Sequence, residues 1–181
     1  MSIPAFITHY SRGEPFRSMT SVPADKLPGI LKELNETTAW GIARFSDPEY
    51  LARRHEVEKR IRQEFIAKGG NPDLEHPIYF FLGGDAEFEK HERNRGYVIP
   101  MSEIAESDIC FAYGDSMLTF NPDYRAQFGE KYKSSLCAKI FLKNELESLF
   151  SHPEFSKDHY LRIEALLWRM PKIENVQNLK L

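Results

Sequence analysis

Residues 46–84, SDPEYLARRHEVEKRIRQEFIAKGGNPDLEHPIYFFLGG, place a long helical pattern directly before a short apolar one. Ser46 with Glu49 three residues later forms a capping box, and Gly69-Gly70 suits a helix stop. We therefore expect one long amphipathic helix over residues 47–68. The stripe expected to be buried consists of Tyr50, Val57, Ile61 and Phe65. The other faces carry Arg53, Arg54, Glu58, Lys59 and Arg62.

The apolar run that follows, residues 78–82, ends at Gly83-Gly84 and predicts a strand buried on both faces. Further strands are expected over residues 3–10, 97–99, 109–113 and 159–168. Shorter helices are expected over residues 25–35, 121–129 and 143–150, and residues 136–142 fit either strand or helix. Gly114-Asp115 predicts a hairpin turn into residues 117–120. The longer of the expected helices lie in the N-terminal part of the chain and most of the expected strands follow them. This order favours an α+β fold with a mostly antiparallel sheet.

Composition limits the class of protein. The chain has 181 residues, a length at which a single domain over residues 1–181 is expected. Its net charge is −3. No run approaches the ~18 apolar residues of a membrane span, and the first residues lack a signal-peptide core, so we expect a cytoplasmic protein without membrane contact. Cys110 and Cys137 do not make a disulfide scaffold and are expected to be inert core thiols.

The late strand over residues 159–168 has two different faces, because side chains alternate along a strand. One face carries Leu161, Ile163, Ala165 and Leu167. The other carries Tyr160, Arg162, Glu164, Leu166 and Trp168. A cation and a carboxylate flanked by aromatic rings suit a binding site, and they also suit an ion pair on an edge strand.

The end of the first strand carries a second polar group, His9-Tyr10-Ser11-Arg12. Loops at strand ends often carry binding residues. Arg12 and Arg17 would suit a phosphate group as a bidentate clamp, and they also suit an ordinary surface. His9 is a candidate site residue, with a buried core histidine as the alternative.

Three segments, ITHYSR at 7–12, HPIYFFL at 76–82 and YLRIEALLW at 160–168, together resemble the ADP-ribosyltransferase superfamily. The resemblance is to its His-Tyr-Glu branch, with bacterial transferase toxins that modify DNA or RNA as nearest kin. It implies a split, mostly antiparallel sheet that binds NAD as the substrate, and a macromolecular acceptor, either nucleic acid or protein.

The resemblance also implies roles for individual residues. His9 would bind the ribose, Tyr79 would stack on the nicotinamide, and Glu164 would bond the ribose 2′-hydroxyl and steer the nucleophile. A carboxylate suits this chemistry because breaking the nicotinamide–ribose bond builds positive charge on the sugar. The further residues assigned to the nucleotide are Tyr10, Ser11, Arg12, Arg17 and Arg162.

Two alternatives remain open. A rival branch of the same superfamily uses Arg, Ser-x-Ser and Glu-x-Glu, which Arg12, residues 18–21 and residues 87–89 would supply in order. A non-enzymatic interaction protein of phage, plasmid or immunity type would instead pair Arg162 with Glu164 on a closed surface. Its exposed aromatic anchors would be Phe81, Phe88, Tyr97 and Tyr124. The histidines show no HxxxH or HExxH spacing, so no metal site is expected.

Overall fold

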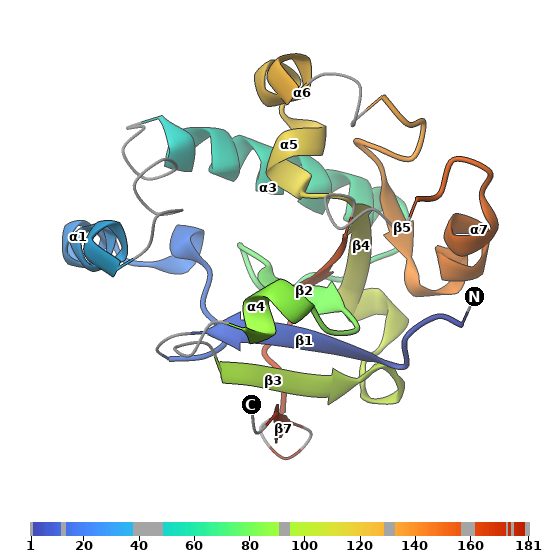
Figure 1. Ribbon diagram of the computed structural model, residues 1–181, viewed down its shortest axis with the longest axis horizontal. Helices are drawn as coiled ribbons and strands as arrows, with labels where there is room; N and C mark the ends of the chain where they lie inside the picture. The colour runs from blue at the N-terminus through green and yellow to red at the C-terminus, as the bar shows by residue number, and fades with distance from the viewer. Residues whose placement is uncertain are drawn as a thin grey trace.

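The computed structural model describes residues 2–11, 14–37, 49–90, 95–128, 133–156, 162–172, 174 and 176–179. Its centre is a seven-stranded sheet in the order β5-β4-β6-β2-β1-β3-β7, with neighbouring strands antiparallel (Figure 1). The strands are β1 (Phe6–Ser11), β2 (Ile78–Leu82), β3 (Arg95–Pro100), β4 (Ile109–Tyr113), β5 (Ile140–Leu142), β6 (Ile163–Leu167) and β7 (Gln177–Leu179). The helices are α1 (Leu27–Thr37), α3 (Tyr50–Ala67), α4 (Ala86–Glu89), α5 (Ser116–Phe120), α6 (Pro122–Phe128) and α7 (Leu146–Ser151). This is the expected α+β fold.

The sheet is split between β1 and β2. β1 pairs with β3 along its whole length, whereas β1 and β2 share one register pair, Thr8 with Phe81. Beyond that pair, Gly83 at φ 78° turns the chain away, and its N–H donates to the Phe6 carbonyl at 2.8 Å. The molecule therefore has two half-sheets, β5-β4-β6-β2 and β1-β3-β7, joined along a narrow seam.

Helix α3 lies across one face of the larger half-sheet (Figure 1). The expected stripe is confirmed, because Tyr50, Val57, Ile61 and Phe65 are all buried. Ser46 of the expected capping box lies outside the described residues, and the helix begins at Tyr50. Below α3 the apolar core contains Cys110, Ala112, Met117, Phe120, Ile140, Leu166 and Trp168.

The opposite face of the sheet packs against α7 and the loops beside it. Its core contains the buried side chains of β6 and β2 that point away from α3, including Ile163, Ala165 and Phe80. The alternation expected for the late strand is therefore confirmed where it is described, because Leu166 and Trp168 lie in the α3 core and Ile163 and Ala165 in the other.

Glu58 departs from expectation. The sequence pattern assigned it to a polar face of α3, yet its side chain is only 1% exposed. The Thr20 and Tyr79 hydroxyl groups donate to its Oε1 at 3.0 and 2.9 Å, and His76 Nδ1 lies 2.8 Å from Oε2. These partners satisfy a charge that would otherwise be costly to bury.

The expected hairpin after β4 is wrong, because residues 116–120 form helix α5. The cause is Asp115, whose carboxylate accepts from the Met117 and Leu118 N–H groups as an N-cap. Of the ambiguous residues 136–142, the last three form strand β5, whereas residues 136–139 are neither strand nor helix. Strand β7 was not expected. The other expected elements are present, with ends shifted by a few residues. Residues 159–161, the expected start of the late strand, lie outside the described residues.

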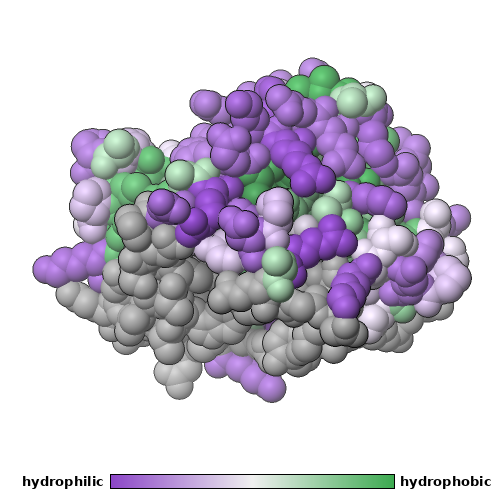
Figure 2. All heavy atoms as spheres, turned by 90° about the horizontal axis from the view of Figure 1, so that it is seen from above, coloured by the Kyte–Doolittle hydropathy of each residue, from purple (hydrophilic) through white to green (hydrophobic). Residues whose placement is uncertain are grey.

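Seen from above, the surface over α3 and its neighbours is mostly hydrophilic, with small hydrophobic areas between polar side chains (Figure 2). Among the described residues, no helix is long and apolar enough to cross a membrane. The four aromatic residues proposed as exposed anchors, Phe81, Phe88, Tyr97 and Tyr124, are half-buried rather than exposed. Cys110 and Cys137 are buried free thiols, and burial raises the pKa of Cys110 to about 12.

The packing of α3 predicts a large difference between two isoleucines on the same helix. Ile61 is fully buried, so Ile61→Ala should lower the free energy of unfolding by about 2–5 kcal/mol. Ile66 is 47% exposed, so Ile66→Ala should change it by no more than about 0.5 kcal/mol. Urea unfolding of the two variants measures both values, and equal losses would contradict the packing described here.

Candidate active site

Three residues form a row across the middle of the sheet. Thr8 on β1 pairs with Phe81 on β2, and Phe81 pairs with Glu164 on β6. Because directly paired residues point to the same side, the three side chains share one face, with Thr8 and Glu164 about 10 Å apart along the row. Residues two positions away along each strand point the same way. We call this side the Glu164 face, and its members are Thr8, Tyr10, Tyr79, Phe81, Arg162 and Glu164.

Glu164 lies beside the start of helix α5. The Ser116 N–H donates to Glu164 Oε2 at 3.0 Å, and the Asp115 carboxylate is close enough to repel it. Burial, with Asp115 next, raises the pKa of Glu164 to about 7, while hydrogen bonding from Ser116 and the charge of Arg54 lower it. Near neutral pH this carboxyl group therefore changes readily between its acidic and basic forms, as a general acid or base requires.

Tyr79 holds a cation on its ring. The Arg54 guanidinium carbon lies 4.2 Å from the ring centroid, and the Tyr79 hydroxyl donates to Glu58 Oε1 at 2.9 Å. Burial raises the pKa of Tyr79 well above its ordinary value, more than the charge of Arg54 lowers it, and Glu58 raises it further. Tyr79 is therefore a neutral phenol that presents an electron-rich face to a flat positive group.

Arg162 is paired with Asp85, at the end of the loop that follows β2. Its guanidinium also lies over the rings of Phe81 and Phe88, at 5.8 and 5.7 Å. The interaction hypothesis expected Arg162 to pair with Glu164, and this pairing is wrong because Asp85 takes the cation. Tyr10 also contacts Asp85, because its hydroxyl oxygen accepts from the Asp85 N–H at 2.8 Å.

His9 lies on the opposite face from Glu164. The Phe16 N–H donates to His9 Nε2 at 3.0 Å, so that nitrogen is an acceptor and Nδ1 carries the hydrogen that it donates to the Tyr79 carbonyl at 2.7 Å. Burial lowers the pKa of His9, and the imidazole is neutral. The expected convergence of His9 and Glu164 in one pocket is not found, because strand alternation separates them.

The remaining candidates lie at the end of β1 and in the loop after it. The Ser11 hydroxyl donates to the Glu14 carbonyl, and exposed Arg17 forms an ion pair with the Glu14 carboxylate at 2.9 Å. Arg12 lies outside the described residues, so the clamp expected from Arg12 and Arg17 is placed only in part. Of the rival motif, Ser18 and Thr20 belong to the hydrogen-bond network around Glu58.

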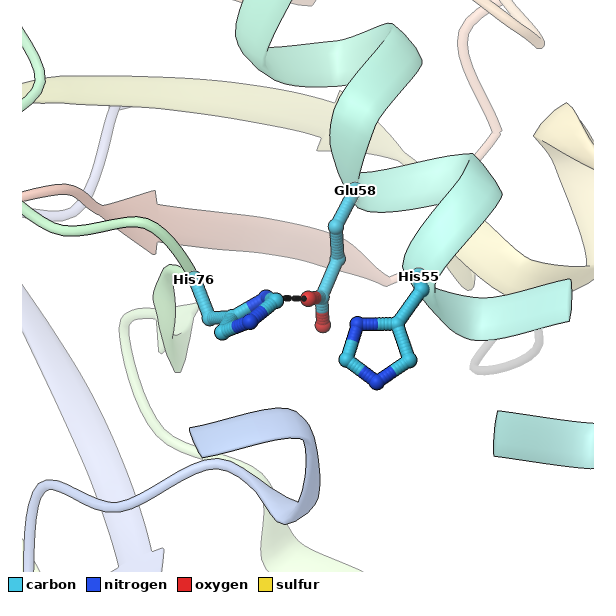
Figure 3. A group of neighbouring side chains, drawn as sticks. All are labelled: His55, Glu58 and His76. Atoms are coloured by element: carbon cyan, nitrogen blue, oxygen red, sulfur yellow. Dashed lines mark hydrogen bonds and ion pairs between the residues drawn. The ribbon is translucent and has the colours of Figure 1, made fainter. Parts of the chain in front are cut away.

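Two features were missed by sequence reasoning. Thr8 Oγ1 is buried on the Glu164 face, and within the described part of the chain it has no hydrogen-bond partner. His55, Glu58 and His76 bring their ligand atoms within 4.8 Å of one another (Figure 3). The sequence feature that could have pointed to Thr8 is its position next to His9 in a strand, which turns its side chain to the opposite face. For the histidines it is the i, i+3 spacing of His55 and Glu58, which His76 completes only in three dimensions.

The neutral state of His9 predicts a pH effect on stability. In the unfolded chain His9 titrates near its ordinary pKa of 6.5, whereas in the folded chain it takes up a proton only at lower pH. Its contribution to stability is thus complete above pH 6.5 and is lost as the pH falls towards the folded pKa. On acidification from about pH 7 to 5, wild-type protein should lose more unfolding free energy than His9→Asn in urea titrations. Equal losses would contradict a buried neutral His9.

Comparison with known proteins adds no identity to this site. The chain matches no family model, no curated protein and no solved structure.

Proposed function

We propose that this protein is an NAD-dependent ADP-ribosyltransferase-like enzyme that acts on a macromolecular acceptor, either nucleic acid or protein. The observation that supports this function best is that Glu164 and Tyr79 lie on one face of neighbouring central strands. Thr8, on the next strand, adds a buried hydroxyl group without a partner among the described residues on the same face. The geometry favours a ligand that has both a flat cationic ring and polar sugar atoms.

The reaction would use Glu164 as the catalytic carboxylate. Transfer breaks the bond between ribose C1′ and the nicotinamide nitrogen, whose electron pair leaves with neutral nicotinamide. The acceptor nucleophile then bonds to C1′ and loses its proton. An ionised Glu164 would stabilise the positive charge on the sugar and bond its 2′-hydroxyl, and the carboxylate would receive the acceptor proton.

Tyr79 would bind the nicotinamide ring. In the structure the ring carries the Arg54 guanidinium, which is flat and positively charged. The nicotinamide of NAD is flat and positively charged too, so binding requires it to take the other side of the ring or to displace Arg54. Thr8 would donate to or accept from a nucleotide oxygen, which would satisfy its buried hydroxyl group.

His9 takes a different role from the one expected for a ribose ligand. Its Nδ1–H holds the Tyr79 carbonyl, so we assign it as a positioning residue for β2. This assignment keeps His9 in the proposed enzyme while accounting for its place on the opposite face.

Binding of NAD should stabilise the folded protein. A ligand at about 100 times its dissociation constant adds about 2.7 kcal/mol, which raises the melting temperature by a few degrees. We expect this shift with millimolar NAD in wild-type protein, Glu164→Gln and Tyr79→Phe, and its loss in Tyr79→Ala. An equal shift in Tyr79→Ala would contradict stacking on Tyr79. No shift in wild-type protein would contradict the proposed function and favour the interaction hypothesis.

Release of nicotinamide from NAD should depend on ionised Glu164. The rate should rise with pH through about 7, where the carboxyl group loses its proton. Glu164→Gln should lower the rate by about 100-fold or more and abolish this pH dependence. Glu147→Gln, at an exposed site on α7, is the matched control and should leave the rate unchanged. Full activity in Glu164→Gln would overturn the assignment.

A further inference from the structure

Two histidines and one carboxylate come together on the side of α3 that contacts Thr20 and Tyr79. His55 and Glu58 are one turn apart on the helix, and His76 comes from the loop that leads into β2. Figure 3 shows both imidazole rings beside the Glu58 carboxylate. The ligand atoms of all three side chains lie within 4.8 Å of one another, and the two ring centroids are also 4.8 Å apart.

These distances suit a shared metal ion. Zn²⁺ binds imidazole nitrogen and carboxylate oxygen at about 2.0–2.2 Å, so ligands of a tetrahedral ion lie about 3.3 Å from each other. His76 Nδ1 is already 2.8 Å from Glu58 Oε2. His55 is exposed, so its side chain has room to move toward the other two ligands when an ion binds. Two histidines and one glutamate also match the ligand set of open zinc sites, in which water completes the coordination.

The carboxylate is held in place from behind. Both Thr20 and Tyr79 donate to Oε1 of Glu58, and the Ser18 hydroxyl bonds Thr20 in turn. Arg54 Nε also lies on the Oε1 side, at 3.4 Å. Oε2 is therefore the oxygen that faces the histidines. Hydrogen bonds of this kind fix the orientation of metal ligands in known sites and strengthen binding.

We propose that His55, Glu58 and His76 form a mononuclear site for a divalent transition-metal ion, with Zn²⁺ as the ion tested first. The donor set is imidazole and carboxylate, which suits zinc and does not suit the all-oxygen preference of Mg²⁺ or Ca²⁺. The exposed His55 gives an ion access from solvent, and the open positions are filled by water. Glu164 takes no part in this site, although Tyr79, which would stack on the nicotinamide, also donates to Glu58. The metal proposal does not rest on the proposed transferase activity.

The test is Zn²⁺ binding to the full chain without a histidine tag, by competition with a chromophoric chelator. We expect one Zn²⁺ per chain in wild-type protein, and at least about tenfold weaker binding in both His55→Ala and His76→Ala. His152→Ala is the matched control, because His152 is half-buried and lies outside the cluster, and it should bind Zn²⁺ as wild-type protein does. Co²⁺ in place of Zn²⁺ should give visible absorption bands that disappear in the same two variants.

Three results would overturn the proposal. The first is no Zn²⁺ binding by wild-type protein at concentrations up to about 100 µM. The second is unchanged stoichiometry and affinity in His55→Ala, which is the decisive variant because an exposed histidine can be replaced without unfolding the chain. The third is equal weakening in His152→Ala, which would show surface binding by histidines in general. NAD binding measured on the same variants keeps the two proposals separate, since each can fail alone.

Discussion

The buried carboxylate of Glu58 is the constraint on which the arrangement of this molecule depends. A charge that is 1% exposed must keep its partners, because leaving it unpaired costs several kcal/mol. Besides Arg54 on α3 itself, its partners come from three places: Thr20 before α1, Tyr79 on β2 and His76 in the loop before β2. Satisfying this one group therefore sets the rotation of α3 about its axis and its position over the sheet. The same requirement gives Tyr79 its orientation on the Glu164 face.

Local patterns predicted the elements of the fold well. The apolar stripe of α3, the strand at residues 78–82 and the alternation of the late strand all depend on neighbours along the chain. The sequence-based predictions were wrong where a residue distant in the sequence, or a side chain that caps a helix, determines the local structure. Glu58 fits a polar face by spacing and is buried only because Thr20 and Tyr79 reach it. The segment after Gly114 reads as a hairpin and becomes helix α5 because the Asp115 side chain caps it.

The candidate site could be predicted in part, and strand alternation explains which part. Glu164 was proposed from its place on the late strand and Tyr79 from the family resemblance, and the register of β6 on β2 puts them on one face. Histidine is a residue type common in binding sites, but His9 is adjacent to Thr8 on the same strand, so its side chain points to the opposite face of the sheet and packs against Phe80. No spacing rule links His76 to α3, since the contact exists only once β2 is docked. Residue type can be read from a sequence, but the face of a sheet can be assigned only when the register is known.

The hydrogen bonds of His9 determine which positions near the seam tolerate substitution. Both of its ring nitrogens bond to main-chain atoms, the Tyr79 carbonyl and the Phe16 N–H. The hydrogen bond from His9 to the Tyr79 carbonyl links the two half-sheets and does not depend on which side chain stands at position 79. A different side chain at position 79 would leave that link in place, although it would remove the hydroxyl group that donates to Glu58. Position 9 has no such freedom, because few side chains offer a donor and an acceptor at the spacing of an imidazole ring.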